Sequence, residues 1–571
     1  MSTIPNAVDT AAQEKRNKQI KNTRDNVYKL VYHDAYTPFV DGLPQEELDL
    51  PAAARAVHII GELGKDTVEG SFSKVGSFIE GIVKKEGPYD HYYDLLPKDF
   101  TWHGWKRDIP STFRTWRNED DFGFQRLNGF NPYTIEKYVP MDKFPITDEL
   151  LKGVLPERET IASMMRQNRL YMCDYYFLEG CPLKEPHKKC WASPIGLFGI
   201  GKAGSGNDGK LYPYAIQLVQ DPKDGPIFTP TDDPGLWTLV KMFFAQADVN
   251  THAFMKHVFT THTFPETIYV TAKRNMAKEH PLLQYLIGHF WFTLVVNRSA
   301  RLLLIADAPA GIAQKVYAPG FAGLEELVRR QREMFDFNDY NPRHDFKRRG
   351  VDDRKGLPCY HFRDDALQLY DIVEKYVVAL IDNIYPSEDD MKGDYELQNW
   401  IKEMVEVIKI KNFPFPKDGK LKNKKALVDL IAPITFTCSA RHASVNSPQF
   451  DYIGYIPNAP ASMTIPIPKE KYKRYSDEEI ALGLPGWKDT VLQVALTATL
   501  STPTEKNRKL GQYANDLLKD RPSLTKCVRE FQDDLEKMSL YISTRNEALK
   551  KEGKEEYLWM DPDRIAAGVD I

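Results

Sequence analysis

Long, almost unbroken apolar segments dominate the chain after residue 236 and limit the folds that it can adopt. Four stretches of helical length, 237–262, 280–306, 364–385 and 396–410, are rich in apolar residues, and several are apolar around nearly the whole helix. Helices of this kind are buried on all sides rather than along one face. The pattern therefore predicts a mainly α fold, with one large helical body around its longest helices.

Composition narrows the class of protein without indicating its chemistry. The 571 residues are 42% hydrophobic, and 76 Lys and Arg against 80 Asp and Glu give a net charge of −4. Such a balance argues against a nucleic-acid partner, which calls for a basic patch. No apolar run reaches membrane-spanning length, the first residues lack the apolar core of a signal peptide, and the six cysteines form no CxxC pair. We expect a soluble, cytoplasmic protein with reduced thiols.

The N-terminal region carries helical rather than strand-like patterns. Residues 1–21 are polar and charged, which predicts a mobile or surface lead-in. Two helical patterns follow within 49–85, and the second has a one-sided apolar stripe through Val68, Phe72 and Val75. Packing of this stripe on the main body is favoured over contact with a membrane surface, because few basic residues flank it.

A short β section is predicted at 193–220, where two apolar runs flank a Gly-rich turn. The turn contains the pattern GxGxxG at 199–204, which binds dinucleotides only where it opens a helix. Here a second strand pattern follows the glycines. We therefore interpret the turn as a hairpin loop.

Five of the thirteen histidines lie between residues 252 and 289, and three of them recur at five-residue intervals: His252, His257 and His262. In an ideal α-helix, residues five positions apart lie on different faces. A widened π-type turn brings such positions onto one face. Any one of them could be an ordinary core histidine. Buried imidazoles need partners, so three at a regular interval on an apolar helix favour metal ligation.

A second polar pair lies far downstream, at His442 and Asn446. The two residues are four positions apart, which puts both side chains on one helical face. By itself, such a pair can be a buried hydrogen bond. Together with two of the earlier histidines, it gives a nitrogen and oxygen set that suits a first-row transition metal. Zinc fits less well, since Asn is an unusual zinc ligand.

These segments resemble the metal-binding helices of lipoxygenases. The family's histidine pattern is three at five-residue intervals, then one 18 residues on and another nine later, and it matches His252, His257, His262, His280 and His289. The resemblance covers roughly 110–571. Further matches are NxxAR (297–301), ARHASVN (440–446), WRNEDDFGFQRLNGFNP (116–132), HFRDDAL (361–367), ELQNW (396–400) and LPGWKDTVLQVALTATLS (484–501).

The resemblance implies a large helical lipoxygenase-type catalytic domain over 110–571 with a minor β element. A short helical N-terminal extension, 1–109, precedes it. Animal and plant members begin with a β-sandwich domain of PLAT type, whereas nothing in 1–110 alternates like a run of strands. The chain therefore looks like a reduced lipoxygenase without that domain.

Carried over position by position, the resemblance implies five metal ligands, one of which is the α-carboxylate of the last residue. Iron is the expected metal, and manganese comes second because some fungal members use it. The five ligands are His257, His262, His442, Asn446 and Ile571.

The implied reaction inserts O2 into the 1,4-pentadiene of a free polyunsaturated fatty acid of the linoleate or arachidonate type. A metal-bound hydroxide takes a hydrogen atom from the bis-allylic carbon, and dioxygen adds to the radical to give a hydroperoxide. Leu304 matches the bulky residue over the pentadiene, and Ala300 matches a position at which Ala accompanies S products; core packing would also explain both. Gln449 matches the amide that orients the Asn ligand.

One departure from the family pattern keeps a second function open. Gln usually follows the first histidine of the triplet, and this chain has Ala253 there. A hydroperoxide isomerase or epoxyalcohol synthase on the same scaffold is therefore the alternative. An inactive lipid-binding relative is less favoured, because all five ligand positions are retained. We expect a monomer, with peripheral membrane contact as a further option.

Overall fold

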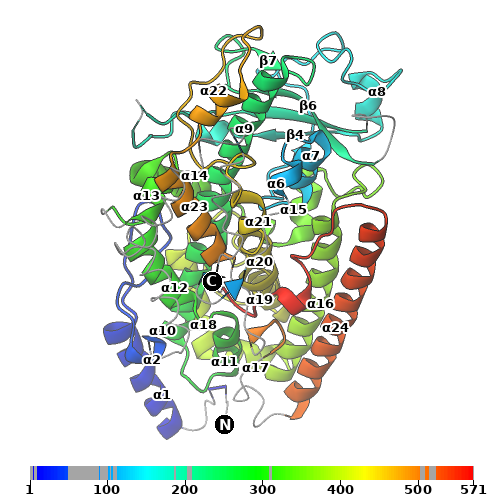
Figure 1. Ribbon diagram of the computed structural model, residues 1–571. Helices are drawn as coiled ribbons and strands as arrows, with labels where there is room; N and C mark the ends of the chain where they lie inside the picture. Colours follow the sequence, from blue (N-terminus) through cyan, green and yellow to red (C-terminus); the bar gives the residue numbers. More distant parts are fainter. Residues whose placement is uncertain are drawn as a thin grey trace.

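The structure, a computed structural model, describes residues 4–5, 10–48, 89, 101–102, 105–106, 112–185, 188–201, 209–307, 311–501, 508–512 and 522–569. Over these residues the protein is mainly α, as predicted, and one small sheet lies at one end of the helical body (Figure 1). Long helices, among them α16 and α24, run side by side away from the sheet.

The elements follow the labels of Figure 1. The α-helices are α1 (Thr10–Asn22), α2 (Gln45–Leu48), α6 (Thr112–Thr115), α7 (Glu119–Asn128), α8 (Ile161–Arg166), α9 (Pro234–Thr251), α10 (Phe264–Asn275), α11 (Pro281–His289), α12 (Thr293–Ser299), α13 (Ile312–Val316), α14 (Gly320–Met334), α15 (Pro342–Arg349), α16 (His361–Ile384), α17 (Glu388–Gly393), α18 (Tyr395–Val407), α19 (Lys424–Phe436), α20 (His442–Asn446), α21 (Gln449–Ile453), α22 (Asp477–Leu482), α23 (Trp487–Leu500) and α24 (Pro522–Lys551). The π-helical segments are η1 (Thr23–Val27), η3 (His252–Thr263), η4 (Ala300–Leu304) and η6 (Thr437–Arg441). The 3₁₀ turns are η2 (Tyr176–Leu178), η5 (Phe337–Tyr340) and η9 (Pro562–Arg564). The strands are β1 (Thr101–Trp102), β2 (Trp105–Lys106), β3 (Glu136–Lys137), β4 (Leu170–Asp174), β5 (Ile195–Ile200), β6 (Leu211–Gln217) and β7 (Ile227–Phe228).

The main sheet has the order β3-β4-β5-β6-β7, and neighbouring strands are antiparallel. β5 and β6 flank the Gly-rich turn and pair with each other, which confirms the predicted hairpin. Helix α7 approaches β6 so closely that a Cβ on Gly123 would lie 1.8 Å from the carbonyl oxygen of Leu211. Only glycine allows this approach, so the residue seats the sheet against the helical body.

The central helix runs through α9, η3 and α10 and forms the middle of the molecule. It begins at the N-cap Asp233, whose side chain accepts from the backbone N–H groups of Gly235 and Leu236. Every residue of α9 from Leu236 to Thr251 is buried, as the apolar sequence predicts.

The middle of this helix is the π-helical segment η3, which confirms the widened turn predicted from the histidine spacing. Pro265 lacks an N–H, so the carbonyl of Thr261 loses its α-helical donor. Hydroxyl groups bond back to other carbonyls of the stretch: Thr260 Oγ1 donates to the carbonyl five residues earlier, and Thr261 Oγ1 donates to that of His257, each at 2.8 Å. The local sequence thus supports the turn that carries two of the predicted ligands.

A second interrupted helix packs against η3. Pro433 lies inside α19, and the π-helical segment η6 follows and leads directly into α20. π-helical turns are rare and cluster at functional sites. One pair of predicted ligands therefore lies within a π-helical segment, and the other, His442 and Asn446, begins and ends the α-helical turn directly after one.

The N-terminal region lies against the helical body. Helix α1 is mostly exposed, but Arg16 is buried and donates to both carboxylate oxygens of Glu396 on α18, at 2.5 and 2.8 Å. Further along the chain, η1 contacts α10 and α2 contacts α12. The helical patterns predicted at 49–85 lie outside the described residues.

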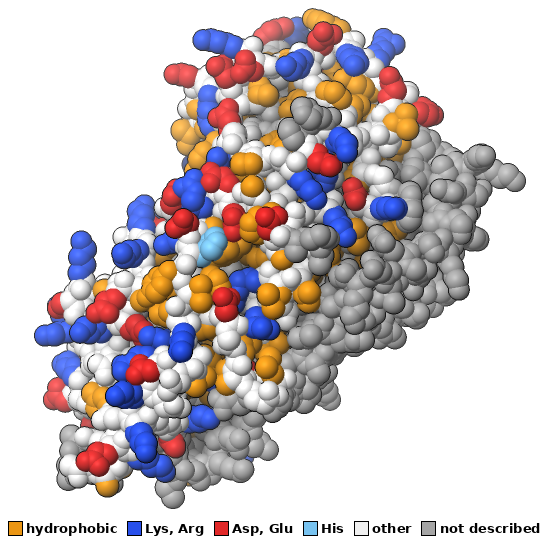
Figure 2. Space-filling view, turned by 90° about the vertical axis from the view of Figure 1, so that its left-hand side faces the viewer, with side chains coloured by type: hydrophobic (Ala, Val, Ile, Leu, Met, Phe, Trp, Pro, Cys, Tyr) orange, Lys and Arg blue, Asp and Glu red, His pale blue; other side chains and the backbone are white. Residues whose placement is uncertain are grey.

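Charged side chains of both signs are interspersed on the face that Figure 2 presents. Lys and Arg alternate there with Asp and Glu, so the described part of this face carries no extended field of one sign. None of the described helices combines the length and the apolar character that crossing a membrane requires.

Candidate metal centre and cavity

Three predicted ligands meet in the interior. His257 and His262 project from η3, and His442 projects from the start of α20. Their Nε2 atoms lie 3.0 Å apart for His257 and His262, 3.2 Å for His262 and His442, and 3.4 Å for His257 and His442. Among the described residues, this is the one group of His, Cys, Asp or Glu side chains close enough to hold a metal ion together.

The triangle of Nε2 atoms has the size that one ion requires. Nitrogen ligands about 2.1 Å from an ion lie about 3.0 Å apart at right angles and about 3.4 Å apart in a tetrahedron. The tautomer of His262 fits as well, because its Nδ1 lies 2.8 Å from Oδ1 of Asn297. That oxygen can only accept, so Nδ1 carries the proton and Nε2 presents its lone pair.

Burial keeps the three imidazoles neutral. It lowers the pKa of His262 to about 4, against the opposing effect of the bond to Asn297. It also lowers the pKa of His257 and His442 well below the ordinary histidine value, and the neighbouring imidazoles add to this. Neutral nitrogens whose lone pairs converge cannot form hydrogen bonds with one another. Such a group of lone pairs is suited to bind a cation.

Asn446 lies one helical turn after His442 on the same face of α20. Its amide is held at both ends: Nδ2 donates to the carbonyl of Leu500 at 2.6 Å, and Oδ1 accepts from Nε2 of Gln449 at 3.0 Å. A carbonyl oxygen has a second lone pair, so Oδ1 can still serve a metal. Gln449 is buried and fixes the orientation of this amide.

The remaining histidines of the pattern have ordinary partners and do not join the cluster. Each places one ring nitrogen against an oxygen that accepts a hydrogen bond: His252 against Val445 O (2.7 Å), His280 against Asp394 Oδ2 (2.8 Å) and His289 against Ala567 O (2.7 Å). Their geometry is that of buried histidines that brace the fold.

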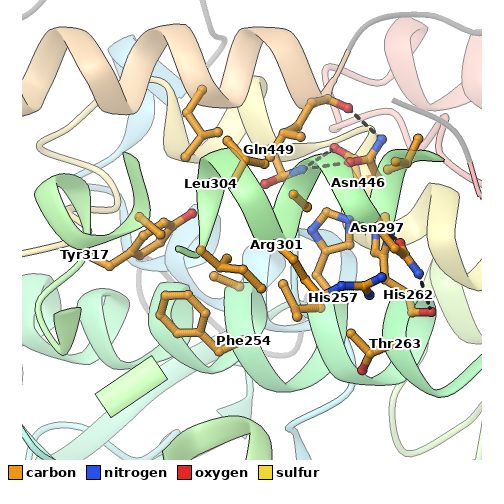
Figure 3. Close-up of a pocket in the computed structure, with 18 residues that line it drawn as sticks. Phe254, His257, His262, Thr263, Asn297, Arg301, Leu304, Tyr317, Asn446 and Gln449 are labelled. Atoms are coloured by element: carbon orange, nitrogen blue, oxygen red, sulfur yellow. Dashed lines mark hydrogen bonds between the residues drawn. The ribbon is translucent and has the colours of Figure 1, made fainter. Parts of the chain in front are cut away.

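A cavity opens beside the cluster, and His257, His262 and Asn446 form part of its wall (Figure 3). Ala300 and Leu304, the first and last residues of η4, also line it. Figure 3 shows His257, His262 and Asn446 toward one side of the cavity, and Phe254, Leu304 and Tyr317 toward the other. The other lining residues are Ala253, Phe254, Val258, Thr263, Val296, Asn297, Arg301, Ile305, Ala313, Tyr317, Gln449, Leu496 and Leu500.

An ion pair with a fully buried carboxylate lies next to His262. Glu266 on α10 is fully buried, and Arg301 donates to its two oxygens at 2.7 and 3.0 Å. Asn297 donates to the same carboxylate at 2.8 Å, and it also donates to the carbonyl of His262. A continuous set of contacts therefore leads from Arg301 through Glu266 and Asn297 to His262.

Sequence reasoning singled out Asn297 and Arg301 only as parts of the NxxAR motif, and it missed Glu266. The one available signal was an acidic residue four positions after His262 in an otherwise apolar stretch. Such a residue needs a buried partner.

The C-terminal segment is buried up to Val569, the last described residue. The contact of His289 with Ala567 fixes this segment. A Cβ on Gly568 would lie 2.5 Å from the carbonyl oxygen of His289, so a residue larger than glycine would clash with this backbone. Ile571, the predicted carboxylate ligand, lies outside the described residues.

The fold and the site define a class of helical protein in which a three-histidine cluster faces a mainly apolar cavity. The sequence profile of the lipoxygenase family matches residues 101–557. The chain belongs to the lipoxygenase family, and it is a dioxygenase enzyme of that kind.

Individual relatives agree with this assignment. The chain is 30% identical to the 12R-type arachidonate 12-lipoxygenase of Rattus norvegicus, over 88% of this chain and 71% of that protein. It is 31% identical to the polyunsaturated fatty acid lipoxygenase ALOX8 of Mus musculus, over 80% of this chain and 66% of that protein. Among solved structures, coral 8R-lipoxygenase has a TM-score of 0.88 at 26% identity, and the match covers all of this chain and 83% of the coral chain. A lipoxygenase crystallised anaerobically with arachidonate matches equally well, with the same TM-score, identity and coverage.

Proposed function

We propose that the protein is a non-haem iron dioxygenase that inserts O2 into the 1,4-pentadiene of free polyunsaturated fatty acids and releases fatty acid hydroperoxides. The observation that carries the proposal is the convergence of three imidazole nitrogens, 3.0–3.4 Å apart, at the wall of a mainly apolar cavity. A relative of the same fold binds arachidonate, which supports a fatty acid as the substrate class.

The proposed ligand set is the one implied by the sequence. His257, His262 and His442 supply neutral nitrogens, and Asn446 supplies an amide oxygen that Gln449 holds in place. The α-carboxylate of Ile571 completes the set and brings its only negative charge. The chemistry supplied by an iron ion held there is the removal of a hydrogen atom from the bis-allylic carbon of the substrate.

The protein's own part is to bind the acyl chain, orient it and exclude water. Apolar side chains such as Leu304 and Phe254 line the cavity that would take the acyl chain, while His257, His262 and Asn446 form part of its wall. Ala300 leaves room beside the pentadiene, and by the family's pattern we propose S stereochemistry for the product. We further propose that the enzyme is a cytoplasmic monomer that collects its substrate from solution or from a membrane surface.

Position 253 favours keeping a second candidate, a hydroperoxide isomerase. Ala253 lines the cavity and ends in a methyl group, so it gives Gln449 no hydrogen bond. The link between the Asn446 amide and the cavity wall is therefore shorter than in the family pattern. A metal centre tuned in this way would rearrange a fatty acid hydroperoxide, which already contains both oxygen atoms, without consuming O2.

Product analysis tests both candidates. Iron-loaded protein is incubated with linoleate or arachidonate while oxygen uptake is recorded, and the products are separated on a chiral column. Uptake of one O2 per conjugated-diene hydroperoxide supports the dioxygenase. Conversion of added hydroperoxide without oxygen uptake, and no turnover of the fatty acid, would replace it with the isomerase. Metal analysis of the purified protein distinguishes iron from manganese.

A further inference from the structure

A short N-terminal segment, residues 36–41, lies against the back of the ligand-bearing helix. We call it the strap. Residues 36–40 are all buried, with exposed fractions of 5% for Tyr36, 1% for Thr37, 7% for Phe39 and 1% for Val40. The strap is more than 200 residues away in sequence from the helices that it contacts, so specific tertiary contacts hold it there.

The first set of contacts joins the strap to the central helix next to His262. Thr37 Oγ1 donates to the carbonyl of Thr263 at 3.1 Å, directly after the ligand in sequence. One turn further, Thr267 Oγ1 lies 2.6 Å from the carbonyl of Pro38 and 2.8 Å from Thr37 Oγ1. The strap therefore contacts the central helix where the π-helical segment ends and α10 begins, directly after His262.

The second set of contacts surrounds the Glu266–Arg301 ion pair. Arg301 donates to the carbonyl of Val40 at 3.0 Å, and the Val40 N–H points at Glu266 over 3.5 Å. The ring of Phe39 lies 4.2 Å from the guanidinium carbon of Arg301, a cation–π contact. The strap thus gives the pair an acceptor, a weak donor and an aromatic face. A buried ion pair needs such added partners, because its own attraction offsets its desolvation only in good geometry.

We propose that the strap is a positioning element for His262. It fixes the Glu266–Arg301 pair, the Glu266 carboxylate holds Asn297, and the Asn297 oxygen sets the tautomer and ring orientation of His262. Partners behind a metal-bound imidazole alter metal affinity by about 10- to 100-fold. The inference rests on the metal site of the proposed function, and it adds a part of the N-terminal region to that site.

Two strap variants and one control test the inference. Thr37→Val removes the hydroxyl contacts with little change of shape, and Phe39→Leu removes the ring over Arg301. Tyr32→Ala is the control, since Tyr32 precedes the strap and is 67% exposed. Each protein is loaded with iron, and two quantities are measured: the rate of iron loss to a chelator, and the Tm difference between loaded and metal-free protein.

For both strap variants we expect iron loss about tenfold faster than in the wild type and a smaller Tm difference, because weaker binding stabilises the folded state less. The control should match the wild type in both. Phe39→Trp, which keeps an aromatic face, should recover most of the retention. If Phe39→Leu fails to fold, the iron-loss rate and the Tm difference of Thr37→Val test the inference alone.

A purely structural strap gives a different result, with Tm lowered equally in loaded and metal-free protein and iron loss unchanged. That outcome would overturn the inference and leave the proposed function standing. A wild-type protein that retains no transition metal would instead overturn the proposed function, and the role of the strap with it.

Discussion

Two groups of buried histidines lie in the same helical core and differ in what their nitrogens face. His252, His280 and His289 each point at a carbonyl or carboxylate oxygen. In the other group, formed by His257, His262 and His442, the Nε2 atoms point at one another. The comparison shows that burial and residue type do not define a metal site. What sets the second group apart is that three ring nitrogens converge within 3.4 Å, an arrangement that could hold a metal ion.

The comparison also limits what spacing can indicate. His252, His257 and His262 have equal intervals in sequence, and the widened helix does bring the last two together. His252 starts the π-helical segment and turns to the carbonyl of Val445 on α20 instead. The regular interval therefore predicted the local geometry of the helix correctly. The interval alone did not indicate which of the three histidines would meet His442 on a helix far away in sequence.

Replacing a converging histidine should have the largest effect. His262→Ala removes one of three neutral nitrogens, so we expect more than a hundredfold loss of iron affinity and of oxygenation, beyond the effect of a residue that only touches a ligand. Metal content and oxygen uptake measure it. His280→Gln is the matched control, because it alters a buried histidine that faces Asp394. Equal iron loss in both variants would erase the distinction between the two groups.

The second prediction concerns the anionic ligand. Adding one glycine after Ile571 converts the α-carboxylate into a neutral peptide group with little change in its position, so we expect iron retention to fall by about a hundredfold. Ile571→Val keeps the terminal carboxylate and should retain iron nearly as the wild type does. Full retention by the extended chain in metal analysis would remove the carboxylate from the proposed ligand set.

The third prediction concerns the oxygen behind His262. Asn297→Leu removes the acceptor for Nδ1, so the imidazole loses its fixed tautomer and iron affinity should fall by about 10- to 100-fold. Asn275→Leu is the control. Asn275, on α10, is also a buried amide, and it donates a hydrogen bond to the carboxylate of Glu403. Both variants should lose stability, but only the first should lose iron in a chelator titration. Unchanged affinity in Asn297→Leu would contradict the role of this contact.

Much of the helical architecture was predictable, because it follows from local sequence. The apolar segments gave the buried helices, and the interval of the histidines gave the π-helical segment that Pro265 and its neighbouring threonines support. The Gly-rich turn between two strand patterns gave the hairpin. Each of these features depends on residues close together in the chain.

Features that depend on distant contacts were not predictable in this way. The polar lead-in gave no sign that Arg16 is buried against Glu396. Nothing in the sequence after it indicated that Thr37 and Val40 contact the helix of His262. Glu266 and Arg301 are 35 residues apart, and no periodicity links them. A single sequence records the need of a buried charge for a partner, but it does not say which residue the fold brings there.

The last and smallest expected effect separates the two groups by pH. Burial lowers the pKa of His289 to about 4, against the opposing bond to Ala567. The unfolded chain therefore binds this proton first as the pH falls, so the contribution to stability is present above about pH 6.5 and is lost toward pH 4. His289 alone should account for about 2 kcal/mol of the free energy of unfolding lost between pH 7 and pH 5. Urea unfolding of the metal-free wild type and His289→Gln at both pH values measures this. The variant should be less stable at pH 7 and show a shallower dependence on pH, and equal slopes would mean that this imidazole is not held neutral by its surroundings.

Iron loading should separate the two groups of histidines. A histidine that binds the metal cannot take up a proton without releasing it, so loading should change the titration of the three converging histidines and leave that of His252, His280 and His289 unchanged.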